Sequence, residues 1–434
     1  MLLNMARTAP FSGTARLRIV LMMMTLSVWV ASAQAQSASP DAPREGMTLQ
    51  ALFERSWLRQ PEAQTLQARR DAAQARAHAA DQTFPEPVSL EINQTSGQWI
   101  GSNGARETEV GFSVPLWMPG QRTASRGLVQ AERAHLERKW LASQLRLAAS
   151  VREAWWTWQG ANTDAALAND QWTSARRLAA DVARRTQAGD LARADQHQAE
   201  GAVAAAEAFA AQAQATASSA LAALVALTGD FTLLHSGNEA LHQATLSEPT
   251  PVAAPIEDHP LLNELKDRLA IAEATIQLVK TQTRANPELQ FSASRSRESS
   301  AEGAGQTKVL IGIRLPLQAG PRHDARLAAA LAEALEVQSQ WRLERDRILA
   351  DQHAAQVRLQ SAQAQVDADR RRARLAKESL AFFDKSFRLG ETGLPQRLRI
   401  EAEAAEAQRQ EARSQIVLAA ALSAWRQALG LLPR

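Results

Sequence analysis

Apolar and polar positions follow the same order twice along this chain. In each copy, a helical segment that opens at Gln60-Pro61 or His259-Pro260 stops at a proline, and two stretches with strand-like alternation come next. A very long helical stretch, a turn made of glycine and an acid, and a last helix complete the copy. A repeat of this size indicates duplication of a whole supersecondary unit, because solenoid repeats are shorter. We expect one copy over about 47–229, a connector over 230–258 and a second copy over about 259–430.

Alternation predicts four strands, two in each copy. Within residues 88–94, the apolar side chains of Leu90 and Ile92 share one face of the predicted strand. The opposite face carries polar side chains, namely Ser89, Glu91 and Asn93. The second strand of each pair ends in Val114-Pro-Leu116 or Leu315-Pro-Leu317. Each stretch has the roughly 9–11 residues of a tilted strand that crosses a membrane.

The long helical stretches dominate the chain. Residues 322–389 contain neither Gly nor Pro and are rich in residues that favour helices. A helix of about 68 residues is about 100 Å long, so it needs helical partners along its length. Shorter helices expected over 260–285 and 393–429 match that length when stacked end to end, and 49–83 with 191–228 do so in the first copy. We therefore predict a mainly α fold with a small β part, in which each long helix packs antiparallel to two stacked helices.

The N-terminal pattern predicts export. Arginines precede an apolar run over 19–30 that is too short to span a bilayer, and Ala33-Gln-Ala35 is a small-x-small cleavage site, so residues 1–35 are predicted to be a signal peptide. The signal holds three arginines and no acid, so the net charge of +3 falls to zero in the mature chain. A neutral chain offers no electrostatic footprint for nucleic acid. Cysteine is absent, which excludes disulfides and thiolate metal sites.

No apolar run after the signal reaches the roughly 20 residues of a transmembrane helix. If the mature chain enters a membrane, it must therefore do so through strands in a closed barrel. Four strands are too few to close one, since the smallest single-chain barrels have about eight. Either the strands lie outside a membrane, or several chains share one barrel, and three chains would supply twelve strands.

No enzyme signature occurs, because the chain has no Gly-rich phosphate loop, no Gly-x-Ser-x-Gly and no His-Glu-x-x-His motif. The eight histidines are scattered, so we expect no catalytic residue, no cofactor and no metal site. A soluble periplasmic coiled-coil scaffold would explain the helices and the signal equally well. It does not explain paired, alternating strands at matching places in both copies.

The order of elements, the two Pro-Leu strand ends and the two glycine–acid turns resemble the TolC-like outer-membrane efflux channels over essentially the whole mature chain. This resemblance implies a homotrimer with a 12-stranded barrel in the outer membrane of a Gram-negative bacterium and a helical tunnel in the periplasm. It also implies docking to a periplasmic membrane-fusion adaptor and an inner-membrane pump of the RND type. The segment Pro115–Arg122 looks most like members that serve metal-cation pumps. Drug efflux and type I protein secretion remain alternatives.

The resemblance places both turns at the periplasmic tip of the tunnel. Adaptor docking is expected at Gly189, Asp190, Leu191, Gly390, Glu391 and Thr392. Glycine permits the positive φ found at helix ends, and we expect Asp190 and Thr392 to cap the helices that follow. A tunnel gate is expected one turn further on, at Asp195, Gln396 and Arg399. Arg399 is predicted to pair with Asp195 across the closed tip. Some channels of the family carry acids at the second-copy positions, so this chain departs from an acidic constriction.

Two side-chain clusters receive structural interpretations. Trp155-Trp156-x-Trp158 lies roughly 50 Å along the first long helix, near the junction of the stacked helices. We predict an apolar core there, which also includes Trp57. Arg370–Arg372 and Arg374 are predicted to form a solvated helix face.

Overall fold

The computed structural model describes most of the chain, namely residues 48–96, 106–234, 248–252, 255–297, 305–317 and 320–434. These residues belong to one compact unit. The predicted signal peptide at 1–35 lies outside them. The first copy contains α1 (Leu49–Leu58), α2 (Pro61–Ala80), β1 (Ser89–Ser96), β2 (Arg106–Pro115), α3 (Gln121–Gln187) and α4 (Arg193–Thr228). The second contains α6 (Pro260–Thr281), β3 (Glu288–Arg297), β4 (Gln306–Arg314), α7 (Pro321–Arg388) and α8 (Leu394–Ala428). Short 3-10 turns occur in the connector at η2 (Phe231–Leu234) and η3 (Ile256–Asp258).

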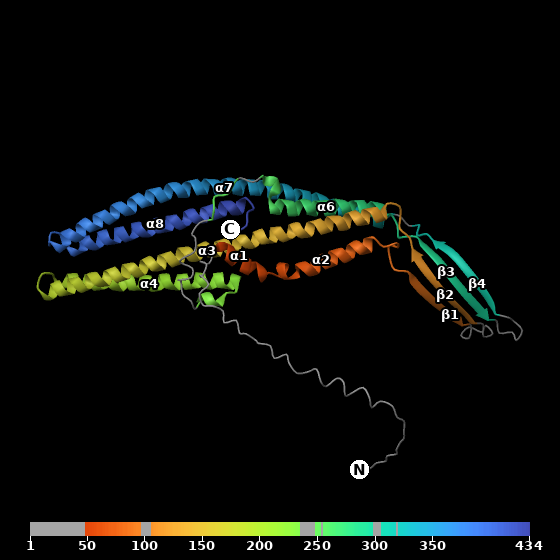
Figure 1. Cartoon of the computed structure of the whole chain (residues 1–434), viewed down its shortest axis with the longest axis horizontal. Helices are drawn as coiled ribbons and strands as arrows, with labels where there is room; N and C mark the ends of the chain where they lie inside the picture. The colour runs from red at the N-terminus through yellow and green to blue at the C-terminus, as the bar shows by residue number, and fades with distance from the viewer. Residues whose placement is uncertain (1–47, 97–105, 235–247, 253–254, 298–304, 318–319) are drawn as a thin grey trace, which may run out of the picture. The chain divides into compact units, whose positions relative to one another are not determined.

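Each long helix packs against shorter helices along its length (Figure 1). α3 contacts α4 towards the glycine–acid turn and α2 towards the strands, whereas α7 contacts α8 and α6 in the same order. α3 also packs against α6 and α8, so the two copies share one helical body. The predicted architecture of paired hairpins with stacked helices is therefore confirmed.

The segment 49–83 is not one continuous helix. α1 ends at Leu58, and α2 starts at Pro61, which has no N–H to donate and whose ring disfavours a helical residue before it. The N–H of Gln60 donates to the carbonyl of Trp57 over 2.9 Å and closes the turn. The break lets α1 pack against both α3 and α4 instead of continuing along the line of α2.

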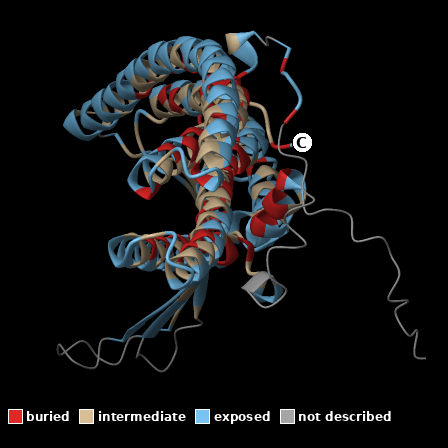
Figure 2. Cartoon of the chain, turned by 90° about the vertical axis from the view of Figure 1, so that its left-hand side faces the viewer, coloured by how far each residue is buried: buried red, intermediate tan, exposed pale blue. Residues whose placement is uncertain are grey.

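The four strands form one antiparallel sheet in the order β1-β2-β3-β4. The register aligns Leu90 with Phe112, Phe112 with Phe291, and Phe291 with Ile311, so apolar residues share one face. The other face is mostly polar. Gly111 lies on it, where an added Cβ would come within 2.9 Å of the Cβ of Ser292. β1 and β4 are the edge strands of the described sheet. Figure 2 shows the strands largely exposed, whereas the buried residues lie among the helices.

α4 is long and apolar enough, by length and composition, to cross a membrane, with a mean hydropathy of 1.2 over an 18-residue window. This contradicts the expectation that no such run follows the signal. The apolar character comes largely from alanine: Ala213 and Ala217 are buried against Ala165 and Ala168 of α3. Small side chains let two helices approach closely along their length. Packing against α3 uses part of this composition, since 28% of the apolar window is buried.

The largest core cluster lies where α1, α3 and the end of α4 meet, a region we call the belt. Trp155 and Trp158 are each only 1% exposed and pack against Leu52, Phe53 and Leu224. The predicted apolar core around these tryptophans is present. The predicted inclusion of Trp57 is wrong, because this buried ring lies outside the cluster and packs edge-on against Trp140, with centroids 5.6 Å apart.

Candidate functional site

Both glycine–acid turns end their helices in the same way. In the first, Gly189 has a φ of 88°, in the left-handed region that glycine adopts without strain. Its N–H donates to the carbonyl of Thr186 over 3.1 Å, and the N–H of Asp190 donates to that of Arg185 over 2.9 Å. The second turn repeats this pattern around Gly390, whose φ is 78°. These paired bonds form a Schellman motif, which satisfies the last carbonyls of a helix.

Asp190 and Thr392 do not cap the helices that follow, so that prediction is wrong. The N-cap residues are Ala192 for α4 and Gly393 for α8. Each loop is longer than a glycine–acid pair, which leaves the acid or threonine ahead of the cap. The Asp195 carboxylate instead accepts a hydrogen bond from the N–H of Ala192 over 3.2 Å. It thereby stabilises the first turn of α4, where backbone N–H groups lack helical partners.

The residues predicted for adaptor docking surround the two turns. Gly189, Asp190, Gly390 and Glu391 are exposed. Leu191 is partly buried against the neighbouring apolar cluster. The hydroxyl of Thr392 lies within hydrogen-bond distance of the Ser386 hydroxyl. The turns thus present exposed glycines and two carboxylates at the helix ends.

The three predicted gate residues lie just beyond the turns, but the polar contacts of the described residues do not join them. Asp195 is engaged at the start of its own helix. Arg399 is 71% exposed, and its guanidinium lies 3.7 Å from Glu403. Gln396 is exposed. The predicted pair between Asp195 and Arg399 is therefore not formed within one chain, because each side chain reaches a group on its own helix.

The contact between the two hairpins near the turns is centred on Phe387 of α7, which sequence reasoning missed. Its side chain is only 2% exposed and packs in a cluster with α3, α4 and α8. Arg185 of α3 lies 5.0 Å from the ring centroid and donates to the Phe387 carbonyl over 3.3 Å. Arg397 of α8 approaches the same ring at 5.6 Å. An aromatic ring between two guanidinium groups therefore joins the hairpins at the tip.

Arg397 is held in place by carboxylates of its own hairpin. It donates to Asp384 and to Glu401, each over 2.9 Å, and its side chain is 12% exposed. Burial raises the pKa of Asp384, but hydrogen bonds from Arg397 and Arg388 outweigh it and leave the pKa below its ordinary value. The sequence feature that could have indicated this tip cluster is Phe387, an aromatic residue three positions before the turn glycine Gly390.

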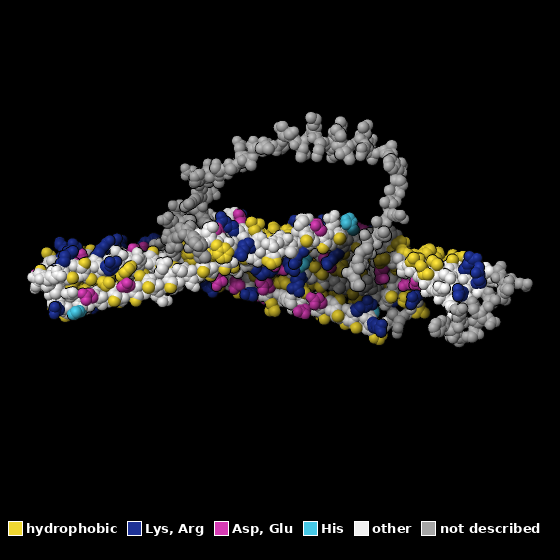
Figure 3. All heavy atoms as spheres, turned by 90° about the horizontal axis from the view of Figure 1, so that it is seen from below, with side chains coloured by type: hydrophobic (Ala, Val, Ile, Leu, Met, Phe, Trp, Pro, Cys, Tyr) yellow, Lys and Arg dark blue, Asp and Glu magenta, His cyan; other side chains and the backbone are white. Residues whose placement is uncertain are grey.

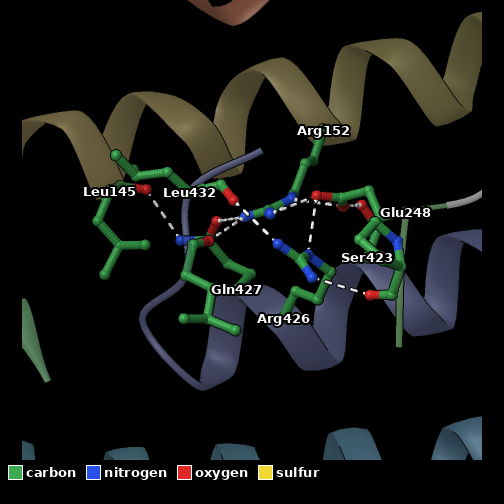
Figure 4. A network of polar contacts seen from close by, with 9 residues as sticks. Leu145, Arg152, Glu248, Ser423, Arg426, Gln427 and Leu432 are labelled. Carbon is green, nitrogen blue, oxygen red and sulfur yellow. Dashed lines mark hydrogen bonds and ion pairs between the residues drawn. The ribbon is translucent and has the colours of Figure 1, made fainter. Parts of the chain in front are cut away.

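At the belt, the hairpins are joined by a buried network of charged and polar side chains, which we call the clasp (Figure 4). Arg152 of α3 and Arg426 of α8 share the single carboxylate of Glu248, at 2.8 Å and 3.1 Å. Ser423 donates to the same carboxylate. All three charged side chains are at most 4% exposed.

The remaining donors of the clasp reach backbone carbonyls and the side-chain oxygen of Gln427. Arg152 donates to Leu431 over 3.0 Å, and Arg426 donates to Pro249 over 2.8 Å. Gln427 lies beside Arg152 and donates to the carbonyl of Leu145 over 2.9 Å. A buried charge is tolerated when it is paired and hydrogen-bonded in this way. The clasp therefore fixes the end of the connector and the C-terminal segment against both hairpins.

Two weaker contacts join the hairpins between the clasp and the tip. Arg413 of α8 binds both oxygens of Asp164 on α3, with its closest approach at 2.9 Å. Arg409 lies 4.9 Å from the ring of Phe209 on α4. Among the described residues, no group of three or more His, Asp or Glu side chains is placed to hold a metal ion.

A family model described as outer membrane efflux protein matches residues 52–230, which contain α1 to α4 and the first turn. Residues 52–230 of the chain therefore resemble the outer membrane efflux protein family. The search of curated proteins finds no match.

Three solved structures share the fold across both copies. CusC is 16% identical, with a TM-score of 0.73 over 88% of this chain and 92% of that one. VceC from Vibrio cholerae is 18% identical, with a TM-score of 0.69 over 88% and 96%. The outer-membrane channel OprN is 18% identical, with a TM-score of 0.71 over 88% and 89%. The duplicated hairpins and the four-stranded sheet are thus the fold of these proteins.

Proposed function

We propose that this chain is one protomer of a trimeric outer-membrane channel that serves as the exit duct of a tripartite efflux pump. The observation that carries the proposal is the sheet. It has one exposed apolar face, and its edge strands have no neighbour within the described chain. Unpaired backbone groups are not tolerated in lipid, so the edges need further strands. Three copies give twelve strands, and β1 of one chain can pair antiparallel with β4 of the next.

The two faces of the sheet suit a barrel wall. Leu90, Ile92, Val309 and Ile311 are between 66% and 74% exposed and would face lipid. The opposite face would line a water-filled lumen. Its acids in β1 and β2 are Glu91, Glu107 and Glu109. Rings of carboxylates favour cations in channels, which supports metal cations as the cargo alongside the likeness of Pro115–Arg122. Drugs and secreted proteins are the alternative cargoes.

The helical hairpins would form a periplasmic tunnel that ends at the two turns. The exposed backbone at Gly189 and Gly390, with Asp190 and Glu391, would meet a membrane-fusion adaptor linked to an inner-membrane pump. Leu389, next to the second turn, is 65% exposed and adds an apolar contact for such a partner. The adaptor and the pump are part of this proposal because residues 52–230 resemble the outer membrane efflux protein family.

The test compares the two faces at neighbouring positions of β1. An arginine on a lipid face near the bilayer midplane costs about 2–4 kcal/mol, whereas one in the lumen stays hydrated. Leu90→Arg should therefore lower the yield of trimer in the outer membrane much more than Glu91→Arg, its matched control. The mass of the detergent-solubilised wild type should correspond to three chains. Equal yields for both variants, or release of the wild type by osmotic shock, would replace the channel with a periplasmic scaffold.

A further inference from the structure

Three arginines interrupt the apolar face of the sheet at the end far from the helices. They are Arg106 at the start of β2 and Arg295 and Arg297 at the end of β3. The register places them on the same face as Phe112 and Phe291, because the residues between them alternate without a break. Figure 3 shows Lys or Arg side chains next to hydrophobic ones on the part of the molecule that holds the sheet.

The placement of these arginines is unfavourable without a counter-ion. Arg106 and Arg297 are direct cross-strand partners, and Arg295 lies opposite Thr108 and Thr307. Side chains directly opposite in an antiparallel pair lie about 5 Å apart, where like charges repel. The ion pairs of the described residues include none with these three arginines, whose side chains are exposed. The neighbouring acid Glu107 points to the other face of the sheet.

We propose that Arg106, Arg295 and Arg297 bind the phosphate groups of an outer-leaflet lipid whose acyl chains lie against the apolar face. The inference rests on the proposed function, since it requires this face to meet lipid. Guanidinium groups bind phosphate with two parallel hydrogen bonds, and one phosphate between two of them removes their repulsion. The adjoining apolar side chains include Val110, Phe112, Phe291 and Val309. They favour a phosphorylated lipid over free phosphate, because an amphiphile contacts both parts of the patch.

The geometry matches the position of a headgroup. Successive residues on one face of a strand lie about 6.8 Å apart, so Arg297 lies roughly 20 Å along β3 from Phe291. A tilt of about 40° reduces this to roughly 15 Å across the membrane, about half of its hydrocarbon thickness. Apolar contact near the midplane and phosphate contact at the rim can therefore be made by one lipid molecule.

The test measures binding of lipid A, which carries two phosphates, to the purified full chain in a neutral detergent. Each arginine near an anionic lipid surface contributes about fivefold in affinity, so Arg106→Gln, Arg295→Gln and Arg297→Gln together should lower affinity on the order of 100-fold. The matched control is the triple change Arg371→Gln, Arg372→Gln and Arg374→Gln on the exposed face of α7, which removes the same charge. It should leave binding unchanged.

Further arms separate the possible sources of phosphate. Lipid A without its phosphates should bind as weakly as lipid A binds to the triple glutamine variant, and inorganic phosphate should not compete at matched concentration. The Arg→Lys triple variant keeps the charge but loses the two-pronged bond, so its affinity should be intermediate. It also provides a folded comparison if the glutamine variant does not assemble. The lipid site would be overturned if the glutamine and lysine variants of Arg106, Arg295 and Arg297 bound lipid A as tightly as the wild type does. Displacement of lipid A by inorganic phosphate would also overturn it. Trimer mass is measured on the same samples, so failure of the channel proposal is seen separately.

Discussion

The belt and the tip both join the two hairpins with arginine side chains, but in different ways. At the belt, Arg152 and Arg426 are almost fully buried around Glu248. At the tip, the guanidinium groups of Arg185 and Arg397 lie near Phe387, next to turns whose glycines and acids are exposed. A buried ion pair is costly to break, because the remaining partner is left charged and dry. At the tip, Arg397 keeps the carboxylates of its own hairpin when the contact with the ring is lost.

This difference indicates that the clasp holds the hairpins in one fixed arrangement, whereas the contact at the tip can open. The clasp holds three segments that are distant in sequence: α3, the end of the connector, and α8 with its C-terminal residues. The tip cluster also joins both hairpins, around Phe387, but the turns beyond it are exposed. Between them, the Arg413–Asp164 contact is about half-exposed on the arginine side. We therefore expect the hairpins to separate from the tip upwards while the belt keeps its geometry.

The largest effect is expected from Glu248→Gln at the belt. It leaves two buried arginines without a counter-charge, which costs about 3–5 kcal/mol of the free energy of unfolding. The matched control is Glu264→Gln, which breaks the Arg146–Glu264 pair of 2.8 Å on a half-exposed arginine and should cost about 0–1 kcal/mol. Urea unfolding followed by tryptophan fluorescence measures both. If the two variants unfold at the same denaturant concentration, the clasp does not hold the hairpins in a fixed arrangement.

The next largest effect is expected from Phe387→Ala at the tip. Truncation of a buried phenylalanine costs about 3 kcal/mol, and here the loss falls on the contact between the hairpins. The variant should raise single-channel conductance in planar bilayers while trimer yield is kept by the belt. Phe382→Ala is the matched control, because that ring lies on the same helix and is 72% exposed. Unchanged conductance in Phe387→Ala would show that this contact does not hold the tip closed.

Local sequence features predicted most of the fold but few of the contacts between hairpins. Alternation located the strands, and the lack of Gly and Pro located α7, because both features act within one element. The turn at Gly189 was predicted correctly. The N-cap of α4 is Ala192 instead of the predicted Asp190, because the glycine alone does not determine the length of the loop. Glu248 lies in a Pro-rich connector, and nothing nearby indicates two arginines from α3 and α8. Such pairs depend on which helix faces meet, which periodicity does not determine.

A smaller effect at the belt is expected from pH. His259 precedes α6 beside Gly430, and burial lowers its pKa from 6.5 to about 4. The unfolded chain takes up a proton below about pH 6.5, whereas the folded chain does so only near its lowered pKa. The free energy of unfolding should therefore be highest above pH 6.5 and fall as the pH falls towards 4.

A cavity of about 750 Å³ lies beside His259, and we expect a smaller loss than from Phe387→Ala. His259→Gln should flatten the change in stability between pH 7 and pH 4.5, if the fold is retained. His197→Gln, at a side chain that is 78% exposed, serves as the control and should keep the wild-type profile. A wild-type pH profile in His259→Gln would assign the acid sensitivity to other groups.

The smallest effect is expected from Asp195→Ala combined with Arg399→Ala at the outermost part of the tip. Within one chain, Asp195 stabilises the start of α4, and Arg399 makes only an exposed contact with Glu403. Each interaction contributes about 0–1 kcal/mol, too little to disturb assembly. In the proposed trimer these small terms would be repeated three times, which is enough to shift a nearly balanced gate. The double variant should therefore raise single-channel conductance slightly, by less than Phe387→Ala, with unchanged trimer yield.

Arg371→Ala, on the exposed face of α7 away from the turns, should leave conductance at the wild-type value. If the double variant also conducts like the wild type while Phe387→Ala does not, the gate lies at the buried ring, and Asp195 and Arg399 serve only their own helices.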